Sequence, residues 1–338
     1  MDSVEVCTQV ALPVVYAYNR QATGMGVLLG LLDKRFHIVA GKGGVGRSSV
    51  AAAIGLVAAR QGLKTLFVEM HTDGSLPTLL GHSAVGPEVG ELEPNLFAIN
   101  ICPDAALQEY ARMKLRSDAA VKLVFGNDFM KRFLRMVPAI DEILLLGKTW
   151  HLESERSSEG RSRWDVIIVD SPATGHGVSI LRLPELILSV VGEGPLASDA
   201  RNMRALITDP ERTAFHIVTL PEELPVEEAV ELERSRVETL SVPAGLCVVN
   251  RVWPDGVPDS EWPAVEEALR GAEDLDGCAN ALEWMRTRQA GQSRLLERIR
   301  ADLSVPVVVL PFVFSPSFGR PAIEMLANHL EAQLEVGE

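Results

Sequence analysis

Residues 36 to 59 place a short apolar run, a glycine-rich loop and an alanine-rich stretch in direct succession. The run at 36–40 has the character of a buried strand, and residues 48–59 have the small apolar side chains of a packed helix. Between them lies the sequence Gly41-Lys42-Gly43-Gly44-Val45-Gly46-Arg47-Ser48-Ser49. A strand, a glycine loop and a helix in this order predict an α/β unit whose loop binds phosphate.

Glycines allow the backbone of such a loop to curl so that successive N–H groups point inward at phosphate oxygens. The N-terminus of the following helix adds a dipole that favours the anion. The predicted phosphate-contacting residues are Gly41, Gly43, Gly44, Val45, Gly46, Arg47, Ser48 and Ser49. We expect the Ser48 hydroxyl to hold Mg²⁺ as well. The alternative is a glycine-rich turn that binds no ligand.

Arg47 departs from the phosphate-loop pattern, which carries a lysine at this position. A lysine is a compact charge on a flexible stem, whereas a guanidinium is broad, planar and always charged. We expect nucleotide binding to survive and hydrolysis to weaken. The alternative is that arginine substitutes at modest cost.

A second strand pattern ends in an acid. Residues 164–169 are apolar except for one aspartate, and Asp170 follows, with Ser171-Pro172-Ala173-Thr174-Gly175-His176 after it. An aspartate at the end of a strand beside a phosphate loop is where nucleotide-bound Mg²⁺ is held. Asp170 is therefore a predicted metal ligand, unless it only caps the next helix.

Apolar runs alternate with helical stretches along the rest of the chain. The candidate strands are 36–40, 65–69, 96–101, 165–170, 214–220, 246–250 and 305–310. Several are continuously apolar, which is typical of strands buried on both faces. The predicted fold is an α/β, doubly wound, mostly parallel sheet flanked by helices. We expect one P-loop domain over 33–338, preceded by a poorly ordered extension at 1–32.

A helical insertion is predicted at about 103–150. Its large apolar residues are spaced to share one helical face, namely Phe129, Phe133, Met136, Val137, Ile140, Ile143 and Leu144. That face either packs on the sheet domain or a second subunit, or forms a groove for an apolar helix of a client protein. Beyond the insertion comes a stretch of mixed charge that we expect to cross the surface as a loop, with Glu153, Glu155, Arg156, Arg161 and Arg163.

Charge and cysteine content limit the classes of partner. The formal net charge of the 338 residues is −14, which argues against a nucleic-acid-binding surface. The four cysteines lie far apart, without the spacing of a zinc site or a disulfide framework. We expect a cytoplasmic protein without zinc, with Cys247 as a small core residue. The first thirty or so residues lack the pattern of a spanning helix or a signal peptide.

Together, the segments 41–49 and 170–176 resemble the deviant Walker A ATPases of the ArsA-like branch, which includes arsenite-pump ATPases and the ATPase that targets tail-anchored membrane proteins. The first is similar to that family's Lys-Gly-Gly-x-Gly-Lys-Ser/Thr loop. The second is similar to its Asp-Thr-Ala-Pro-Thr-Gly-His switch, with proline and alanine exchanged. The resemblance covers roughly 33–335 and is weak in the helical insertion.

The resemblance implies a nucleotide-dependent dimer in which Lys42 reaches the partner's nucleotide. It also implies that Asn250 reads the adenine and that Pro311 and Phe312 flank it. His71 stands where the family has the aspartate that positions the attacking water. Asp73 or Glu69 compensates if the loop has a different register.

The resemblance also bears on partners and on turnover. Neither the Cys-x-x-Cys zinc clasp of the targeting members nor the metalloid-binding cysteines of the arsenite pumps is present, so the chain is most similar to bacterial paired members of unassigned cargo. We expect an ATPase that binds ATP and Mg²⁺, couples its nucleotide state to a client or membrane partner, and hydrolyses ATP to ADP and phosphate slowly. Arg47 and His71 are the reasons for slow turnover. The alternative is a catalytically degenerate subunit of a heterodimer with an intact ArsA-like partner.

Overall fold

The computed structural model describes six stretches of the chain, which are 31–70, 75–115, 140–171, 177–254, 260–270 and 276–335. These residues form two compact units. The larger unit ends at Val252 and resumes at Leu295, and the smaller one is Trp253–Arg294. The expected extension lies almost wholly outside the described residues. Leu31, at its end, is already buried in the core of the larger unit.

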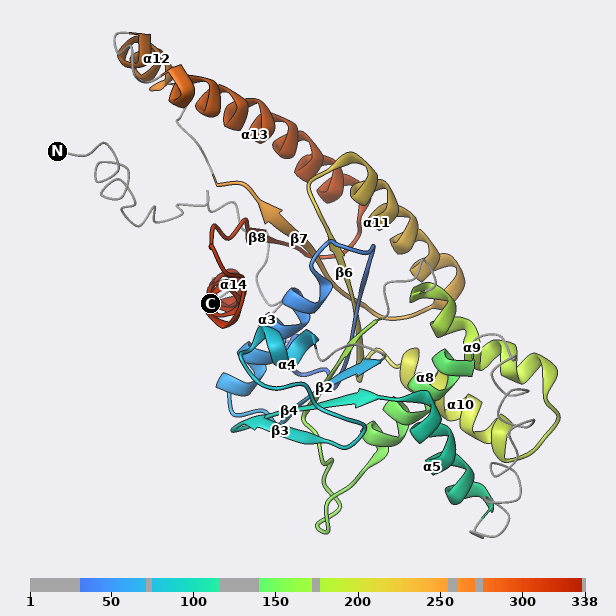
Figure 1. Cartoon of the computed structure of the whole chain (residues 1–338). Coiled ribbons are helices and arrows are strands. Elements are labelled where there is room, and N and C mark those ends of the chain that lie inside the picture. The colour runs from blue at the N-terminus through green and yellow to red at the C-terminus, as the bar shows by residue number, and fades with distance from the viewer. Residues whose placement is uncertain are drawn as a thin grey trace. The chain divides into compact units, whose positions relative to one another are not determined.

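The larger unit is built on an eight-stranded sheet with the order β3-β4-β2-β5-β1-β6-β7-β8 (Figure 1). Its strands are β1 (Phe36–Gly41), β2 (Thr65–Met70), β3 (Gly90–Glu93), β4 (Leu96–Ile101), β5 (Val166–Asp170), β6 (Thr213–Thr219), β7 (Ala244–Val252) and β8 (Val307–Pro311). Only the edge strand β3 runs antiparallel to its neighbour. The doubly wound, mostly parallel sheet predicted from the apolar runs is confirmed.

Helices cover both faces of this sheet, and each face has its own apolar core (Figure 1). One face carries α3 (Arg47–Arg60), α4 (Ser75–Leu79) and α14 (Arg320–Glu335). The other carries α5 (Pro103–Leu115), α8 (Ile140–Ser154), α9 (Gly177–Val190), α10 (Pro195–Ile207), α11 (Glu223–Ser235) and the short π-helix η1 (Arg236–Leu240). Because helices bury both faces of the sheet, the side chains on both sides of each central strand are buried, which explains why these strands are continuously apolar in sequence.

Helix α3 lies deep in its layer because its sequence is small and apolar. Every residue from Val50 to Ala58 is buried. Gly55 permits the closest approach to the sheet, since a Cβ there would come within 2.2 Å of the Phe67 ring. The helix that carries the glycine loop is therefore fixed against the strands and gives the loop a rigid base.

Two histidines form a closed hydrogen-bonded chain in the same core. His37 on β1 and His216 on β6 are fully buried, and their Nδ1 and Nε2 atoms lie 3.0 Å apart. The Leu246 amide donates to His216 Nδ1, so His216 Nε2–H must donate to His37 Nδ1. His37 Nε2–H then donates to the Lys34 carbonyl. Burial lowers the pKa of His37 to about 4, and both rings are therefore neutral.

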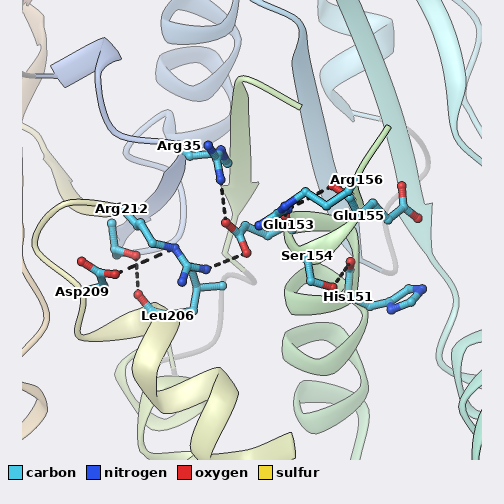
Figure 2. A network of polar contacts seen from close by, with 10 residues as sticks. Arg35, His151, Glu153, Ser154, Glu155, Arg156, Leu206, Asp209 and Arg212 are labelled. Atoms are coloured by element: carbon cyan, nitrogen blue, oxygen red, sulfur yellow. Dashed lines mark hydrogen bonds and ion pairs between the residues drawn. The ribbon is translucent and has the colours of Figure 1, made fainter. Parts of the chain in front are cut away.

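A buried carboxylate ties α8 to the amino ends of β1 and β6 (Figure 2). Glu153 is 1% exposed at its side chain and accepts hydrogen bonds from Arg35 at 3.2 Å and Arg212 at 2.6 Å. The expectation of a surface loop is wrong at Glu153, because α8 continues through this residue and the two arginines neutralise its charge. Beyond α8 the chain turns back on itself, with a bridge between Arg156 and Ser162.

The described part of the helical insertion consists of α5 and most of α8. Leu144 is buried, and Ile140 and Ile143 pack against the core on that face of the sheet. These three members of the predicted apolar stripe therefore face the sheet domain. The other four, Phe129, Phe133, Met136 and Val137, lie outside the described residues.

The smaller unit contains α12 (Trp262–Arg270) and most of α13 (Asp276–Asp302), whose last residues belong to the larger unit. Within it, Trp253 and Trp284 meet edge to face at 5.3 Å, and the Arg288 guanidinium lies over both rings. Among the described residues, no helix has the length and apolar character needed to cross a membrane.

Candidate functional site

The glycine loop follows β1, the strand between β5 and β6, and lies at the carboxyl edge where open parallel sheets bind ligands. Gly41 has φ +152°, and a Cβ on it would meet the Val218 carbonyl oxygen at 2.3 Å. Gly46 has φ +91°, and a Cβ there would meet the Asn250 side chain at 2.2 Å. At these two positions the loop requires glycine both for its backbone angles and for space.

Asn250, at the carboxyl end of β7, holds the loop from the side. Its Oδ1 accepts the Arg251 amide at 2.9 Å, which orients Nδ2 to donate to the Val45 carbonyl at 2.9 Å. The side chain is 3% exposed. The role of Asn250 in reading adenine stays a prediction, and the structure adds a structural role, that of bracing the loop.

Ser48 and Asp170 meet at the start of α3. The Ser48 hydroxyl donates to Asp170 Oδ2, while Asp170 Oδ1 is buried without a hydrogen-bond partner in the described part of the chain. Burial raises the pKa of Asp170 to about 6, against the Ser48 hydrogen bond and the Arg47 charge, which lower it. A hydroxyl beside a carboxylate with an unused oxygen suits an oxygen-seeking divalent cation. These residues therefore fit Mg²⁺.

Asp170 does not have the position of a helix cap. Asp170 is the last residue of β5 and Ser171 after it is not helical, whereas an N-cap residue directly precedes its helix. Because Asp170 is instead hydrogen-bonded to Ser48 of the loop, the metal-ligand interpretation is favoured over the capping alternative.

Arg47 points its guanidinium at the backbone that follows β5. Its Nη1 donates to the Ser171 carbonyl, and the Asp170 charge acts on it as well. Desolvation lowers the pKa of Arg47, and the aspartate opposes that shift. The side chain that replaces the phosphate-reading lysine is thus hydrogen-bonded to the segment after the predicted metal ligand.

Lys42 forms an ion pair within its own chain. Its Nζ donates to Glu228 of α11, and the side chains are 44% and 34% exposed. The contact joins two segments that are 186 residues apart, so no local signal in the sequence pointed to Glu228.

Glu69 is the last residue but one of β2 and is fully buried. Its Oε1 accepts the Ser75 hydroxyl and, at 2.8 Å, the Leu76 amide, so it joins β2 to the start of α4. Its Oε2 is buried with no hydrogen bond to any residue that the structure describes.

The remaining predicted site residues are only partly covered by the structure. Pro311 ends β8, and the Phe312 amide donates to the Val252 carbonyl at 2.8 Å, which places both at the carboxyl edge of the sheet. Ser49 lies in the first turn of α3. His71, Asp73 and residues 172–176 lie outside the described residues, so the predictions made on them stay predictions.

Comparison with protein-family models decides the relationship. The model described as anion-transporting ATPase matches residues 34–193 and 196–270. The chain belongs to the anion-transporting ATPase family. The match includes the glycine loop, Asp170 and Asn250, so the site described above lies inside the matched region. The family resemblance inferred from the two motifs is confirmed.

Relatives of this family member include bacterial and plant proteins. The ATPase BagA of Mycobacterium tuberculosis is 28% identical over 247 residues, covering 72% of this chain and 71% of its own. The ATPase GET3B of Arabidopsis thaliana is 25% identical over 349 residues, covering 87% of this chain and 78% of its own. Family membership and these names imply ATP binding, and they make ATP hydrolysis plausible at the level of the family.

Within the described residues, no cluster of three or more His, Cys, Asp or Glu side chains is arranged as a metal site. Cys102 is exposed and Cys247 is buried in β7 as expected, and both are free thiols. Desolvation raises the pKa of Cys247 to about 12, so it is an unreactive core thiol.

Proposed function

We propose that this chain is a Mg²⁺-dependent ATPase that dimerises, hydrolyses ATP slowly, and couples its nucleotide state to a protein client or membrane partner. The observation that carries the proposal is the Ser48–Asp170 contact at the start of α3, next to a loop in which Gly41 and Gly46 have no room for side chains. Backbone N–H groups of residues 43–48 would hold the phosphates. When bound, the cation neutralises charge on the phosphates and on the leaving group.

Slow hydrolysis is supported by the engagement of Arg47. A lysine at this position would extend toward the β- and γ-phosphates, whereas the guanidinium here donates to the Ser171 carbonyl. That hydrogen bond draws Nη1 toward the backbone after β5, and the broader group would have to fit a crowded phosphate site. We therefore assign Arg47 a part in holding the segment after β5, with weaker stabilisation of the transferred phosphoryl group.

Coupling to a partner is supported by the position of α9. This helix starts directly after residues 172–176, which follow Asp170, and carries apolar side chains that are exposed, with Leu186 at 57% and Val190 at 78%. Asp170 would sense the nucleotide through the cation, and α9 is the next described element after β5. A cytoplasmic client with an apolar segment is the partner this arrangement suits.

Nucleotide binding and single-turnover hydrolysis test the proposal directly. The purified chain should bind ATP with Mg²⁺ and hydrolyse it slowly. Arg47→Lys combined with His71→Asp should raise the single-turnover rate at least tenfold, because both departures from the family pattern are then removed. Failure to bind ATP at millimolar concentration with Mg²⁺ would refute the proposal.

A second candidate function is a non-catalytic subunit that completes a heterodimer. It is favoured by one observation, that Lys42 is intact and 44% exposed while the lysine position within the loop is changed to Arg47. Such a subunit would bind nucleotide and lend Lys42 to a partner's site. The same double variant separates the two functions. If it gains no rate, and activity is present only after an intact ArsA-like subunit is added, the heterodimer is supported.

A further inference from the structure

Two carboxylates lie side by side at the carboxyl edge of the sheet. Strands β2 and β5 are parallel neighbours in which Val68 pairs with Val169, so the next residues, Glu69 and Asp170, are adjacent. Side chains at laterally paired positions point to the same face of a sheet. The Glu69 charge also raises the pKa of Asp170, which agrees with this proximity.

Each of the two carboxylates keeps one oxygen unused. Glu69 commits Oε1 to Ser75 and Leu76, and Asp170 commits Oδ2 to Ser48. Glu69 Oε2 and Asp170 Oδ1 are both buried, and neither has a hydrogen-bond partner among the residues described. Buried polar atoms without partners are rare in native proteins and often mark an ion or water site.

The local charges point to a cation. Asp170 lies near the Arg47 guanidinium, which favours its charged form, and near Glu69, which disfavours it. A second buried negative charge beside Asp170 is unfavourable unless a positive charge compensates it. Contact with α4 alone does not need that charge, because a neutral amide oxygen would accept the same two hydrogen bonds.

We propose that Glu69 is a second carboxylate of the cation site, whose Oε2 accepts a hydrogen bond from a water on the divalent ion held by Ser48 and Asp170. The inference rests on the proposed function and assigns Glu69 a role as a positioning residue. Contact through water is expected because Mg²⁺ sheds its waters reluctantly and keeps several of them in protein sites. The site then combines two carboxylates and a hydroxyl rather than three acidic ligands.

The experiment compares Mn²⁺ binding to the full-length wild type and to Glu69→Gln, with ADP present, by the electron paramagnetic resonance signal of free Mn²⁺. The glutamine keeps an oxygen for Ser75 and Leu76 but removes the charge. We expect Mn²⁺ affinity to fall about tenfold, as for other outer-sphere partners of metal sites. ADP affinity in EDTA should stay within about twofold of wild type, because Glu69 makes no contact with the nucleotide in this proposal.

Ser75→Ala is the matched control, because it removes one hydrogen bond to Glu69 Oε1 and leaves the charge in place. Its Mn²⁺ affinity should remain close to that of wild type. Equal losses in both variants would show that Glu69 acts only by joining β2 to α4, and unchanged affinity in Glu69→Gln would overturn the inference as well. If Glu69→Gln does not fold, Glu69→Asp decides, since it keeps the charge and should retain affinity within about threefold.

The two proposals fail in different ways. A wild type that binds neither ADP nor ATP would refute the proposed function. A wild type that binds nucleotide and Mn²⁺ normally, with a Glu69→Gln variant that does the same, would refute only the role of Glu69.

Discussion

The two edges of the central sheet use polar residues in opposite ways. At the amino edge, Arg35 and Arg212 enclose Glu153, and both oxygens of that buried carboxylate accept a hydrogen bond (Figure 2). At the carboxyl edge, Asp170 and Glu69 each keep one buried oxygen unused. At the amino edge both oxygens of the carboxylate are satisfied by the two arginines, although Arg35 Nε and Arg212 Nε are themselves buried without a hydrogen-bond partner among the residues that the structure describes. At the carboxyl edge each carboxylate keeps an acceptor oxygen that no described residue fills.

This difference separates residues that stabilise the fold from residues that are held ready for a ligand. A buried carboxylate whose acceptor sites are filled contributes to folding and gains nothing from added ions. A carboxylate with a free buried oxygen costs stability until a partner binds, and binding then favours the folded state. Substitutions at the two edges should therefore have different consequences.

The largest effect is expected from Glu153→Gln at the amino edge. Removing the charge leaves Arg35 and Arg212 without a counterion, and breaking a buried ion pair costs about 3 to 5 kcal/mol. Because each arginine side chain is about one-third exposed, we expect the lower end, near 3 kcal/mol, in urea unfolding. ATP affinity should not change.

Glu155→Gln is the matched control for this substitution. Glu155 lies two residues away and pairs with Arg163 at 2.8 Å, and both side chains are more exposed than Glu153. An exposed pair contributes less than about 1 kcal/mol, so the free energy of unfolding should hardly change. Equal losses in the two variants would remove the distinction between a closed buried network and a surface pair.

The buried histidine chain should make stability depend on pH. Because burial lowers the pKa of His37 to about 4, the unfolded chain binds more protons below its ordinary value of 6.5. The stabilisation is complete above that pH and is lost as the pH falls toward 4. Between pH 6.5 and 5 we expect a loss of about 2 kcal/mol, at 1.36 kcal/mol per pKa unit.

Thermal or urea unfolding from pH 7 to pH 5 measures this slope. His37→Gln keeps an acceptor and a donor but does not titrate, so it should flatten the slope while lowering stability at pH 7. His329→Gln, at a partly exposed position on α14, is the control and should keep the wild-type slope. A wild-type slope retained in His37→Gln would show that other groups cause the pH dependence.

At the carboxyl edge, Gly46→Ala should affect both stability and nucleotide binding. The residue has φ +91°, and a Cβ on it would lie only 2.2 Å from Asn250 Nδ2. The Asn250 side chain would therefore have to move. The left-handed conformation alone costs about 1 to 2 kcal/mol for a residue with a side chain. Loss of the Asn250–Val45 hydrogen bond should also distort the glycine loop. We therefore expect the affinity for ATP, measured by calorimetry, to fall at least tenfold.

Gly62→Ala isolates the conformational cost. Gly62 has φ +81°, and no atom lies within 4 Å of its virtual Cβ. It should lose similar stability while ATP affinity stays unchanged. If Gly46→Ala weakens ATP binding no more than Gly62→Ala does, the bracing role of Asn250 is wrong.

The sequence was sufficient for the features that depend on local pattern. Continuous apolar runs such as 166–169 predicted the buried parallel strands, and glycine spacing located the loop before α3. The edge strand β3 was not predicted, because Gly90-Glu91-Leu92-Glu93 is short and partly exposed and lacks the β-branched residues of a buried strand.

Features that depend on long-range pairing could not be predicted. Glu153 looks like any other acid in a stretch of mixed charge, and its partners lie 118 and 59 residues away along the chain. His37 and His216 are single polar residues within separate apolar strands, joined only when β1 and β6 become neighbours. Which polar residues become buried pairs is decided by topology rather than by local sequence.

The smallest effect on stability is expected from Glu228→Gln, which removes the ion pair between Glu228 and Lys42. The two side chains are 44% and 34% exposed, and exposed ion pairs contribute about 0.2 to 1 kcal/mol. The free energy of unfolding should therefore change by less than about 1 kcal/mol. If Lys42 has to leave Glu228 to reach a partner's nucleotide, the variant should instead favour the ATP-bound dimer by up to about fivefold, since 1 kcal/mol corresponds to that factor.

Sedimentation with a slowly hydrolysed ATP analogue measures the dimer, and Glu227→Gln on the same helix is the matched control, because Glu227 lies near Arg298 rather than Lys42. More dimer in Glu228→Gln alone would mean that Lys42, like Asp170 and Glu69, is held at the carboxyl edge for a partner the single chain does not contain. Less dimer would mean that the Lys42–Glu228 pair supports the dimer itself, and the pair would then belong with the closed networks of the amino edge.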